Sequence, residues 1–340
     1  MLGGGAPADR EFCRAILPKV SRTFALGIRL LPAPLEEAVR TSYLLCRIAD
    51  TIEDATALPA DRKRDLLVRF RVCLDTPTED GALLAAAFAR AVSDEDRLVR
   101  ECDRVLRAFH ALSAEERAAV RPWVQEMATG MAEFAARRGT REGIAALATV
   151  AELDRYCYYV AGTVGHLLTD LFRIHHRQMT ATRYERLDAL ATSFGLGLQL
   201  TNIIKDVADD RRRGWSFVPR DLCEVAGLGP DDLQDPSHGS EARRVMEALI
   251  AKAKAHLRDA LAYCTTLPAA AYRIRIFCLT SLYFAIRTLR IAERDPRLLD
   301  PTHKVKITRA EVYRTVAATH LIAPFDPLVR SYYLHLAGRS

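Results

Sequence analysis

Two sets of polar side chains in this 340-residue sequence have the chemical types and the spacing to bind a divalent cation. The first set recurs at intervals of three, four and four residues and consists of Gln199, Asn202, Asp206 and Asp210. Residues at these intervals lie along one face of a helix. Like charges one turn apart weaken a helix by about 0.2–0.5 kcal/mol per pair, so we expect a bound cation to offset the repulsion. We call this set the Asp206 stripe.

A second set with nearly the same layout, the Asp50 stripe, occurs earlier in the chain. It consists of Tyr43, Arg47, Asp50 and Asp54, at intervals of four, three and four residues, and Glu53 lies beside it in sequence. Mg²⁺ prefers oxygen ligands and takes one or two carboxylates together with water and phosphate oxygens. Two such helices facing each other across a cavity could hold Mg²⁺ around a diphosphate and neutralise its charge as it departs. Either stripe, taken alone, could instead be a solvated helix face.

The pattern of apolar residues predicts that these stripes lie on two helices of an all-α protein. Helical periodicity begins near Asp9, pauses at Pro18 and resumes after Ser21. Further helices are expected at 35–55, 60–75, 82–92, 95–111, 114–137, 150–176, 180–212, 240–266, 269–294, 309–320 and 326–336. Neither a strand pattern nor an internal repeat is present. We therefore predict one domain over residues 1–340, with a partly disordered or peripheral N-terminal segment at 1–18.

Composition narrows the class of protein and of partner. The chain carries 49 Lys and Arg against 43 Asp and Glu, a net charge of +6 that suits a small anionic substrate or an acidic membrane surface. This charge is too diffuse to indicate nucleic-acid binding. The eight cysteines are scattered, which favours reduced thiols in a cytoplasmic enzyme over disulfides or zinc. We expect no signal peptide and no membrane span, while peripheral membrane contact stays open; the sequence indicates no oligomeric state.

Four sequence blocks resemble the squalene/phytoene synthase family. They are SRTF at 21–24, DTIED at 50–54, YCYYVAGTVG at 156–165 and NIIKDVADDRRRGWSFVPRD at 202–221. The blocks follow the family's order and spacing, and the resemblance extends over about residues 20–321. It implies an all-α isoprenoid synthase fold whose helices surround a central apolar cavity. It also implies head-to-head condensation of two allylic diphosphates through a cyclopropyl intermediate.

The resemblance assigns roles to residues of both stripes and of the blocks beside them. Mg²⁺ ligands would be Asp50, Glu53, Asp54, Asn202, Asp206 and Asp210. Residues on the diphosphate side would be Ser21, Arg22, Tyr43, Arg47, Gln199 and Lys205. Arginine suits this position because its planar fork matches phosphate oxygens. Tyr156 matches a tyrosine of the first half-reaction, which could assist ionisation or accept a proton. Phe24 matches an aromatic residue whose ring could stabilise a carbocation.

Several of these residues have structural alternatives. Ser21 could serve only as a helix N-cap, and Tyr156 could be a core residue with a satisfied hydroxyl group. Arg47 could simply pair with a neighbouring aspartate, an interaction worth under about 1 kcal/mol on a helix surface. For Gly162 and Gly165 we expect close helix packing rather than ligand contact, because each would otherwise weaken its helix by about 1 kcal/mol.

Two later segments of the sequence help to indicate whether the protein also carries out an NADPH-dependent reduction. The segment KVKITR resembles the part of squalene-forming family members that lies near the phosphates of NADPH, which makes Lys304, Lys306 and Arg309 candidate cofactor ligands. The alternative is a solvated basic loop. Residues 274–288 resemble the family's late cavity helix, with Tyr283 as a candidate substrate contact. Ser281 and Leu282 stand where eukaryotic squalene synthases have Pro-Gln, which, with the expected lack of a C-terminal anchor, suggests a bacterial-type enzyme.

The resemblance therefore predicts a prenyltransferase that condenses two farnesyl diphosphates to presqualene diphosphate and reduces it with NADPH to squalene. An alternative shares only the first half-reaction and releases dehydrosqualene, phytoene or presqualene diphosphate. A second alternative is a family member that has lost catalysis and acts as a binding or assembly protein. Because such a protein would be expected to lose its metal ligands, the presence of all the carboxylates favours an enzyme. The length of the allylic substrate depends on cavity depth and is not indicated by the sequence.

Overall fold

The computed structural model of the protein describes residues 6–76, 80–137 and 145–338. Almost all regular structure in these ranges is helical, which confirms the all-α prediction. The strands among the described residues are β1 (Ala145–Ala146) and β2 (Trp215–Ser216), two residues each, which pair in parallel. Within the same ranges, no helix combines the length and the apolar character that crossing a membrane requires.

The chain separates into two compact units, Met1–Gly139 with His166–Thr180, and Thr140–Gly165 with Ala181–Ser340. The division falls inside one helix, α10 (Thr163–His175). The expectation of one domain over 1–340 stays a prediction.

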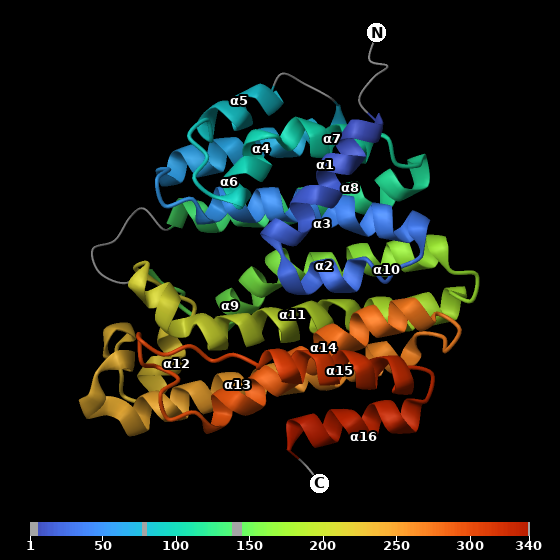
Figure 1. The fold of residues 1–340 in the computed structure, drawn as a ribbon. Helices are drawn as coiled ribbons and strands as arrows, with labels where there is room; N and C mark the ends of the chain where they lie inside the picture. The colour runs from blue at the N-terminus through green and yellow to red at the C-terminus, as the bar shows by residue number, and fades with distance from the viewer. Residues whose placement is uncertain (1–5, 77–79, 138–144, 339–340) are drawn as a thin grey trace. The chain divides into compact units, whose positions relative to one another are not determined.

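The first unit is built around α3, which packs against α1, α4, α7 and α8 (Figure 1). The helices of this unit are α1 Ala6–Val20, α2 Arg22–Ile28, α3 Ala33–Asp54, α4 Ala60–Asp75, α5 Asp80–Ala87, α6 Asp94–Arg100, α7 Cys102–His110 and α8 Ala114–Arg137. Pro34 lies in the first turn of α3, where its fixed φ suits the helix and no amide donor is lost. The start of α3 therefore agrees with the predicted helix within two residues.

The N-terminal helix is part of the core of this unit. Its buried apolar residues are Phe12, Cys13, Ile16, Leu17 and Val20. Asp9 is 2% exposed and accepts hydrogen bonds from Arg104 (3.3 Å) and Arg107 (2.8 and 2.9 Å) of α7. These bonds, above all the two from Arg107, lower the pKa of Asp9. The prediction of a peripheral or disordered segment is therefore wrong for residues 6–18, while residues 1–5 lie outside the described ranges.

The second unit is built on two long helices, α11 and α13, which pack against each other, with α14 packed on both. Its elements are α9 Val150–Cys157, a π-helical turn Tyr158–Gly162, α11 Ala181–Arg212, α12 Arg220–Val225, 3₁₀ turns Pro230–Gln234 and Pro236–His238, α13 Gly239–Thr266, α14 Tyr272–Arg294, α15 Arg309–Ile322 and α16 Asp326–Ala337. The last helix, α16, packs on α13, α14 and α15 (Figure 1).

Glycines let two helical segments of this unit touch through their backbones. A Cβ atom added to Gly195 of α11 would lie 2.2 Å from the carbonyl oxygen of Ala161, and one added to Gly165 would lie 2.2 Å from that of Ala191. Backbone atoms cannot move aside as a flexible side chain can. This confirms the predicted packing role of Gly165. The π-helical turn at the contact was not predicted, and such turns often occur at functional sites.

Replacing Gly195 with alanine is expected to destabilise the protein, because the added methyl group overlaps the Ala161 carbonyl. Overpacking of this kind costs about 1–3 kcal/mol. Gly81→Ala is the matched control, since a Cβ there meets nothing within 4 Å, and a helical Gly→Ala change adds up to about 1 kcal/mol of stability. Denaturant unfolding followed by circular dichroism measures both variants. Equal free energies of unfolding for the two variants would contradict the close approach.

Candidate active site

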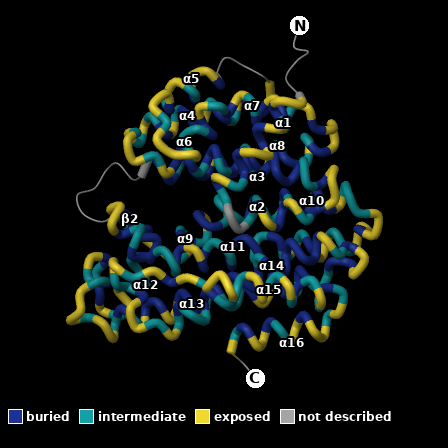
Figure 2. Tube along the Cα trace, in the orientation of Figure 1, coloured by how far each residue is buried: buried dark blue, intermediate teal, exposed yellow. Residues whose placement is uncertain are grey.

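The Asp50 stripe is the accessible line on an otherwise buried part of α3. Between Ala38 and Glu53, every residue is buried except Tyr43, Arg47 and Asp50 (Figure 2). The next residue of the stripe, Asp54, is exposed at the end of the helix. Polar groups on the accessible line of a packed helix can meet a ligand without disturbing the core.

Ion pairs hold the charged groups of this stripe. Arg47 Nη1 lies 2.5 Å from Asp50 Oδ2, and Arg47 Nη2 lies 3.5 Å from Glu95 Oε1. The side chains of Arg47 and Asp50 are 31% and 32% exposed. At this exposure the Arg47–Asp50 pair contributes under about 1 kcal/mol and can open for a ligand. Arg47 therefore pairs with an aspartate, as the structural alternative predicted, and this pairing does not prevent it from binding phosphate.

The SRTF block lies beside the same stripe. The Ser21 side chain hydrogen-bonds the hydroxyl group of Tyr43, which lowers the pKa of Tyr43, although burial outweighs this and the pKa is raised overall. The ring centroid of Phe24 lies 5.6 Å from that of Tyr43. Ser21 occupies the N-cap position of α2 but makes no capping hydrogen bond with its side chain. Capping alone therefore does not explain Ser21; the side chain of Arg22 lies outside the described residues.

Glu53 does not share the accessible line. Its side chain is 0% exposed, on the packed side of α3. Its backbone carbonyl accepts a 2.7 Å hydrogen bond from Lys63 Nζ of α4, which fixes the helix end there. Asp50, three residues earlier, and Asp54, one residue later, both retain exposure. This placement does not support the predicted metal contact of Glu53.

The Asp206 stripe is likewise accessible on a part of α11 whose other residues are mostly buried. Gln199, Asn202, Asp206 and Asp210 all retain exposure, while the intervening residues Leu200, Ile203, Ile204 and Val207 are buried. Lys205 lies beside the stripe, with Nζ 2.5 Å from Asp206 Oδ2. The side chain of Asp206 is 43% exposed. The structure thus brings together every predicted residue of this stripe and its basic neighbour.

Asp209 points to a different partner from Asp206, although the two are on the same helix. Its Oδ2 lies 2.6 Å from Lys304 Nζ, and it also pairs with Arg212. The hydrogen bond from Lys304 is the main cause of the lowered pKa of Asp209. The contact joins the KVKITR segment to the C-terminal part of α11, while Lys306 and Arg309 stay exposed. Sequence spacing did not reveal Asp209, because it lies off the stripe and its partner is 95 residues away.

Tyr156 belongs to an aromatic cluster that sequence reasoning missed. It is buried, and its ring centroid lies 4.7 Å from that of Phe217, which in turn lies 5.7 Å from that of Trp215. Asp221 Oδ2 accepts a 3.1 Å hydrogen bond from the backbone amide of Val150 at the start of α9. The segment that follows the Asp206 stripe therefore holds α9 and places Tyr156. The GWSFVP run was visible in the sequence but had no assigned role.

Tyr283 lies in the core between α14 and α16. It is 0% exposed, its hydroxyl donates a 3.0 Å hydrogen bond to the carbonyl oxygen of Val329, and its ring meets Tyr332 edge to face at 5.0 Å. Burial raises the pKa of Tyr283. A buried phenol with a satisfied hydroxyl group packs helices together. This placement does not support the predicted substrate contact.

The donor groups of each stripe fit Mg²⁺. Each helix presents two accessible carboxylates one turn apart, with hard oxygen atoms. Over the described residues, no three His, Cys, Asp or Glu side chains gather closely enough to hold a metal ion. Mg²⁺ commonly uses one or two carboxylates and completes its shell with water and substrate phosphates. The arrangement therefore suits an ion that is bound together with a phosphorylated ligand.

Asp206→Asn and Asp209→Asn test whether the stripe, rather than acidic charge in general, binds the metal. Both changes remove one negative charge from α11. We expect Asp206→Asn to weaken Mg²⁺-dependent binding of inorganic diphosphate at least about tenfold, equivalent to about 1.4 kcal/mol. Asp209→Asn should stay within about twofold of the parent protein by the same scale, because Asp209 faces Lys304. Isothermal titration calorimetry with and without Mg²⁺ measures both; equal losses would reject the stripe as the metal site.

The chain is similar in sequence to a known protein family and to several of its members. Residues 17–311 match the family described as squalene/phytoene synthase. The squalene synthase of Eremothecium gossypii is 31% identical over 302 residues, covering 88% of this chain and 66% of that protein. The squalene synthase of Schizosaccharomyces pombe is 30% identical over 305 residues, covering 88% and 63%. The chain thus spans slightly less than two thirds of the length of these two relatives.

Solved structures show the same likeness. The structure of TcSQS in complex with the ligand BPH1237 matches with a TM-score of 0.81 and 28% identity, over 98% of this chain and 92% of that one. A crystal structure of a dehydrosqualene synthase matches with a TM-score of 0.65 and 20% identity, over 92% and 96%. At 20% identity the second likeness concerns the fold alone. The isoprenoid synthase fold that the sequence motifs implied is confirmed.

Proposed function

The chain belongs to the squalene/phytoene synthase family, and on this premise we propose that it is a squalene synthase. It would condense two farnesyl diphosphates head to head to presqualene diphosphate and reduce that product with NADPH to squalene. The observation that carries the proposal is the pair of accessible carboxylate stripes on α3 and α11, each with a basic residue beside it. The relatives named squalene synthase support this branch of the family.

Oxygen ligands from both stripes would hold Mg²⁺. These are Asp50 and Asp54 of α3, and Asn202, Asp206 and Asp210 of α11. Mg²⁺ bound there would neutralise charge on the departing diphosphate. In this proposal both stripes serve one catalytic cavity, as the family resemblance implies.

Basic residues beside the stripes would bind the diphosphate directly. Arg47 and Lys205 each hold an aspartate of their own stripe at 2.5 Å. Such partly exposed pairs can exchange a carboxylate oxygen for a phosphate oxygen at little cost, and Arg47 can do so with two parallel hydrogen bonds. Ser21 and Tyr43, which hydrogen-bond each other, would add neutral donors on the same side. By resemblance, Arg22 and Gln199 would complete this set.

Two aromatic residues would act on the reacting carbon centres. Tyr156 would assist ionisation or accept a proton through its hydroxyl group, in line with its family position. Its burial against Phe217 keeps water from its ring. The ring of Phe24, whose centroid lies 5.6 Å from that of Tyr43 at the Asp50 stripe, would stabilise a carbocation through its negative face.

The KVKITR segment would bind the phosphates of NADPH. Lys304, Lys306 and Arg309 keep their side chains exposed, and cationic groups of this kind recognise phosphates. NADPH bound there would supply the hydride for the second half-reaction. The Lys304–Asp209 ion pair would hold the segment beside the α11 carboxylates. We further propose a cytoplasmic location with brief contact with a membrane surface, because squalene is insoluble in water.

Product analysis tests the proposed reaction directly. The protein is incubated with farnesyl diphosphate and Mg²⁺, with and without NADPH, and the extracted products are identified by mass spectrometry. We expect squalene only when NADPH is present and presqualene diphosphate when it is withheld. An unsaturated C30 or C40 hydrocarbon formed regardless of NADPH would favour the alternative without reduction, and no turnover of any allylic diphosphate would favour a binding protein.

A further inference from the structure

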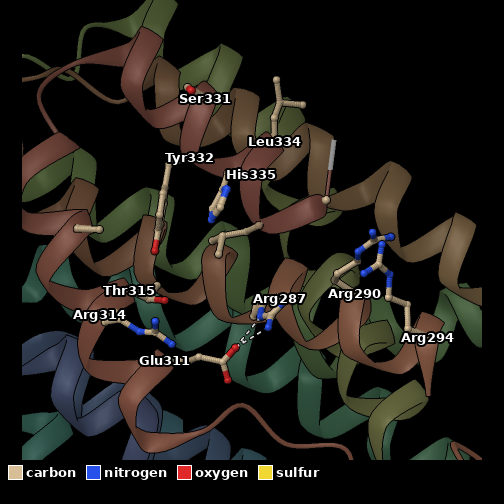
Figure 3. Close-up of a pocket in the computed structure, with 13 residues that line it drawn as sticks. Arg287, Arg290, Arg294, Glu311, Arg314, Thr315, Ser331, Tyr332, Leu334 and His335 are labelled. Atoms are coloured by element: carbon tan, nitrogen blue, oxygen red, sulfur yellow. Dashed lines mark hydrogen bonds and ion pairs between the residues drawn. The ribbon is translucent and has the colours of Figure 1, made fainter. Parts of the chain in front are cut away.

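A basic pocket lies in the second unit, and its lining includes none of the residues that the proposed reaction uses. It is formed by α14, α15 and α16 and has a volume of about 910 Å³. The residues that matter here are Arg287, Arg290 and Arg294 of α14, Arg314 of α15, and Tyr332 and His335 of α16 (Figure 3). Figure 3 shows the side chains of Tyr332 and His335 pointing from α16 toward the side of the pocket that holds Arg287 and Glu311.

Not all the positive charge of this pocket is neutralised by the protein. Arg287 lies 2.5 Å from Glu311 Oε1, and Arg290 lies 3.1 Å from Glu293 Oε2. Arg294 and Arg314 are exposed and form no ion pair within the described part of the chain. Four arginines against one glutamate line the pocket. Clustered like charges repel one another, so an anion bound among them would be favoured.

The pocket also has an apolar side. Leu334, Leu336, Ala318 and the ring of Tyr332 contribute to its lining, and Leu334 is 44% exposed at its edge. Leu328, itself exposed, lies three and four residues before Ser331 and Tyr332 and so shares their face of α16. The volume of this pocket lies within the range of about 300–1,000 Å³ that is usual for small-molecule ligands. A phosphate ion alone would fill only a small part of it. Its ligand would combine a phosphate group with an apolar part.

We propose that this pocket binds the phosphate group of an anionic amphiphile. Arg294 and Arg314 would hold the phosphate oxygens, since the guanidinium fork matches them in pairs of hydrogen bonds. Tyr332 and Leu334 would contact the apolar part. The same chemistry could come from two sources, a phospholipid with an exposed phosphate at a bilayer surface or a soluble diphosphate ester. The inference rests on the pocket alone and does not depend on the proposed reaction.

Two binding measurements on the full chain test the proposal and distinguish the sources. The first is sedimentation with phosphatidylcholine vesicles that contain or lack phosphatidic acid. The second is calorimetry with inorganic diphosphate in EDTA, which silences any Mg²⁺-dependent site. The variant is Arg294→Gln with Arg314→Gln. The control is Arg273→Gln, which removes an exposed charge from the same helix, α14, outside the pocket. Melting temperatures establish that all variants are folded.

We expect the double variant to lose at least about tenfold in affinity for at least one probe, while Arg273→Gln binds like the parent protein. Loss confined to phosphatidic acid vesicles assigns the pocket to a lipid headgroup, and loss confined to inorganic diphosphate assigns it to a soluble ester. The proposal is overturned if the parent protein binds neither probe. It is also overturned if the Arg273→Gln control loses as much affinity per charge removed as the double variant, because general surface charge would then explain the binding.

Discussion

Repulsion between carboxylates one turn apart is the constraint that both stripes of this protein must satisfy. Asp50 and Asp54 on α3, like Asp206 and Asp210 on α11, retain exposure on parts of the two helices whose other residues are mostly buried. Arg47 and Lys205 each hold one of these aspartates at 2.5 Å, which relieves part of the repulsion. A metal ion with a phosphorylated ligand would relieve the rest. The neighbouring carboxylates that weaken each helix when no cation is bound are therefore suited to bind such a ligand.

The packing around the stripes limits how the helices can adjust. On α3, buried residues fill every position around the stripe from Ala38 to Glu53. On α11, the backbone contact of Gly195 with Ala161 leaves no room for a side chain. Stability in these elements therefore comes from burial and close approach, while the stripes carry the charge that the proposed function would use. Because the buried face of each helix supplies its stability, the polar groups of the stripe can occur at regular intervals on the other face.

The sequence could predict whatever depends on local periodicity. The helices that carry the stripes, the accessible face of each stripe and the packing role of Gly165 all follow from spacing within a few turns. The position of Glu53 could not be predicted in this way, because it is adjacent to Asp54 in sequence and only the three-dimensional packing of α3 on its neighbours shows that it is buried. The N-terminal helix was misjudged for a similar reason, since the partners of Asp9 are on α7.

Long-range contacts account for the remaining differences. The hydroxyl group of Tyr283 donates a hydrogen bond to the carbonyl oxygen of Val329, 46 residues later on α16, a contact that the family resemblance, which implied a cavity role for Tyr283, did not indicate. The pairing of Asp209 with Lys304 spans 95 residues and explains how the basic segment lies beside α11. The family resemblance identified both the helix that carries Tyr283 and the KVKITR segment, but it did not indicate these contacts.

The proposed function requires both stripes to bind one Mg²⁺–diphosphate cluster, and a double-mutant cycle tests this requirement most directly. The Mg²⁺-dependent affinity for inorganic diphosphate is measured by calorimetry for Asp54→Asn, Asp206→Asn and the double variant. Because either change disrupts a shared cluster, the double variant should lose at least about 1 kcal/mol less than the two single losses combined. Losses that add within about 0.5 kcal/mol would show two independent sites and contradict the claim.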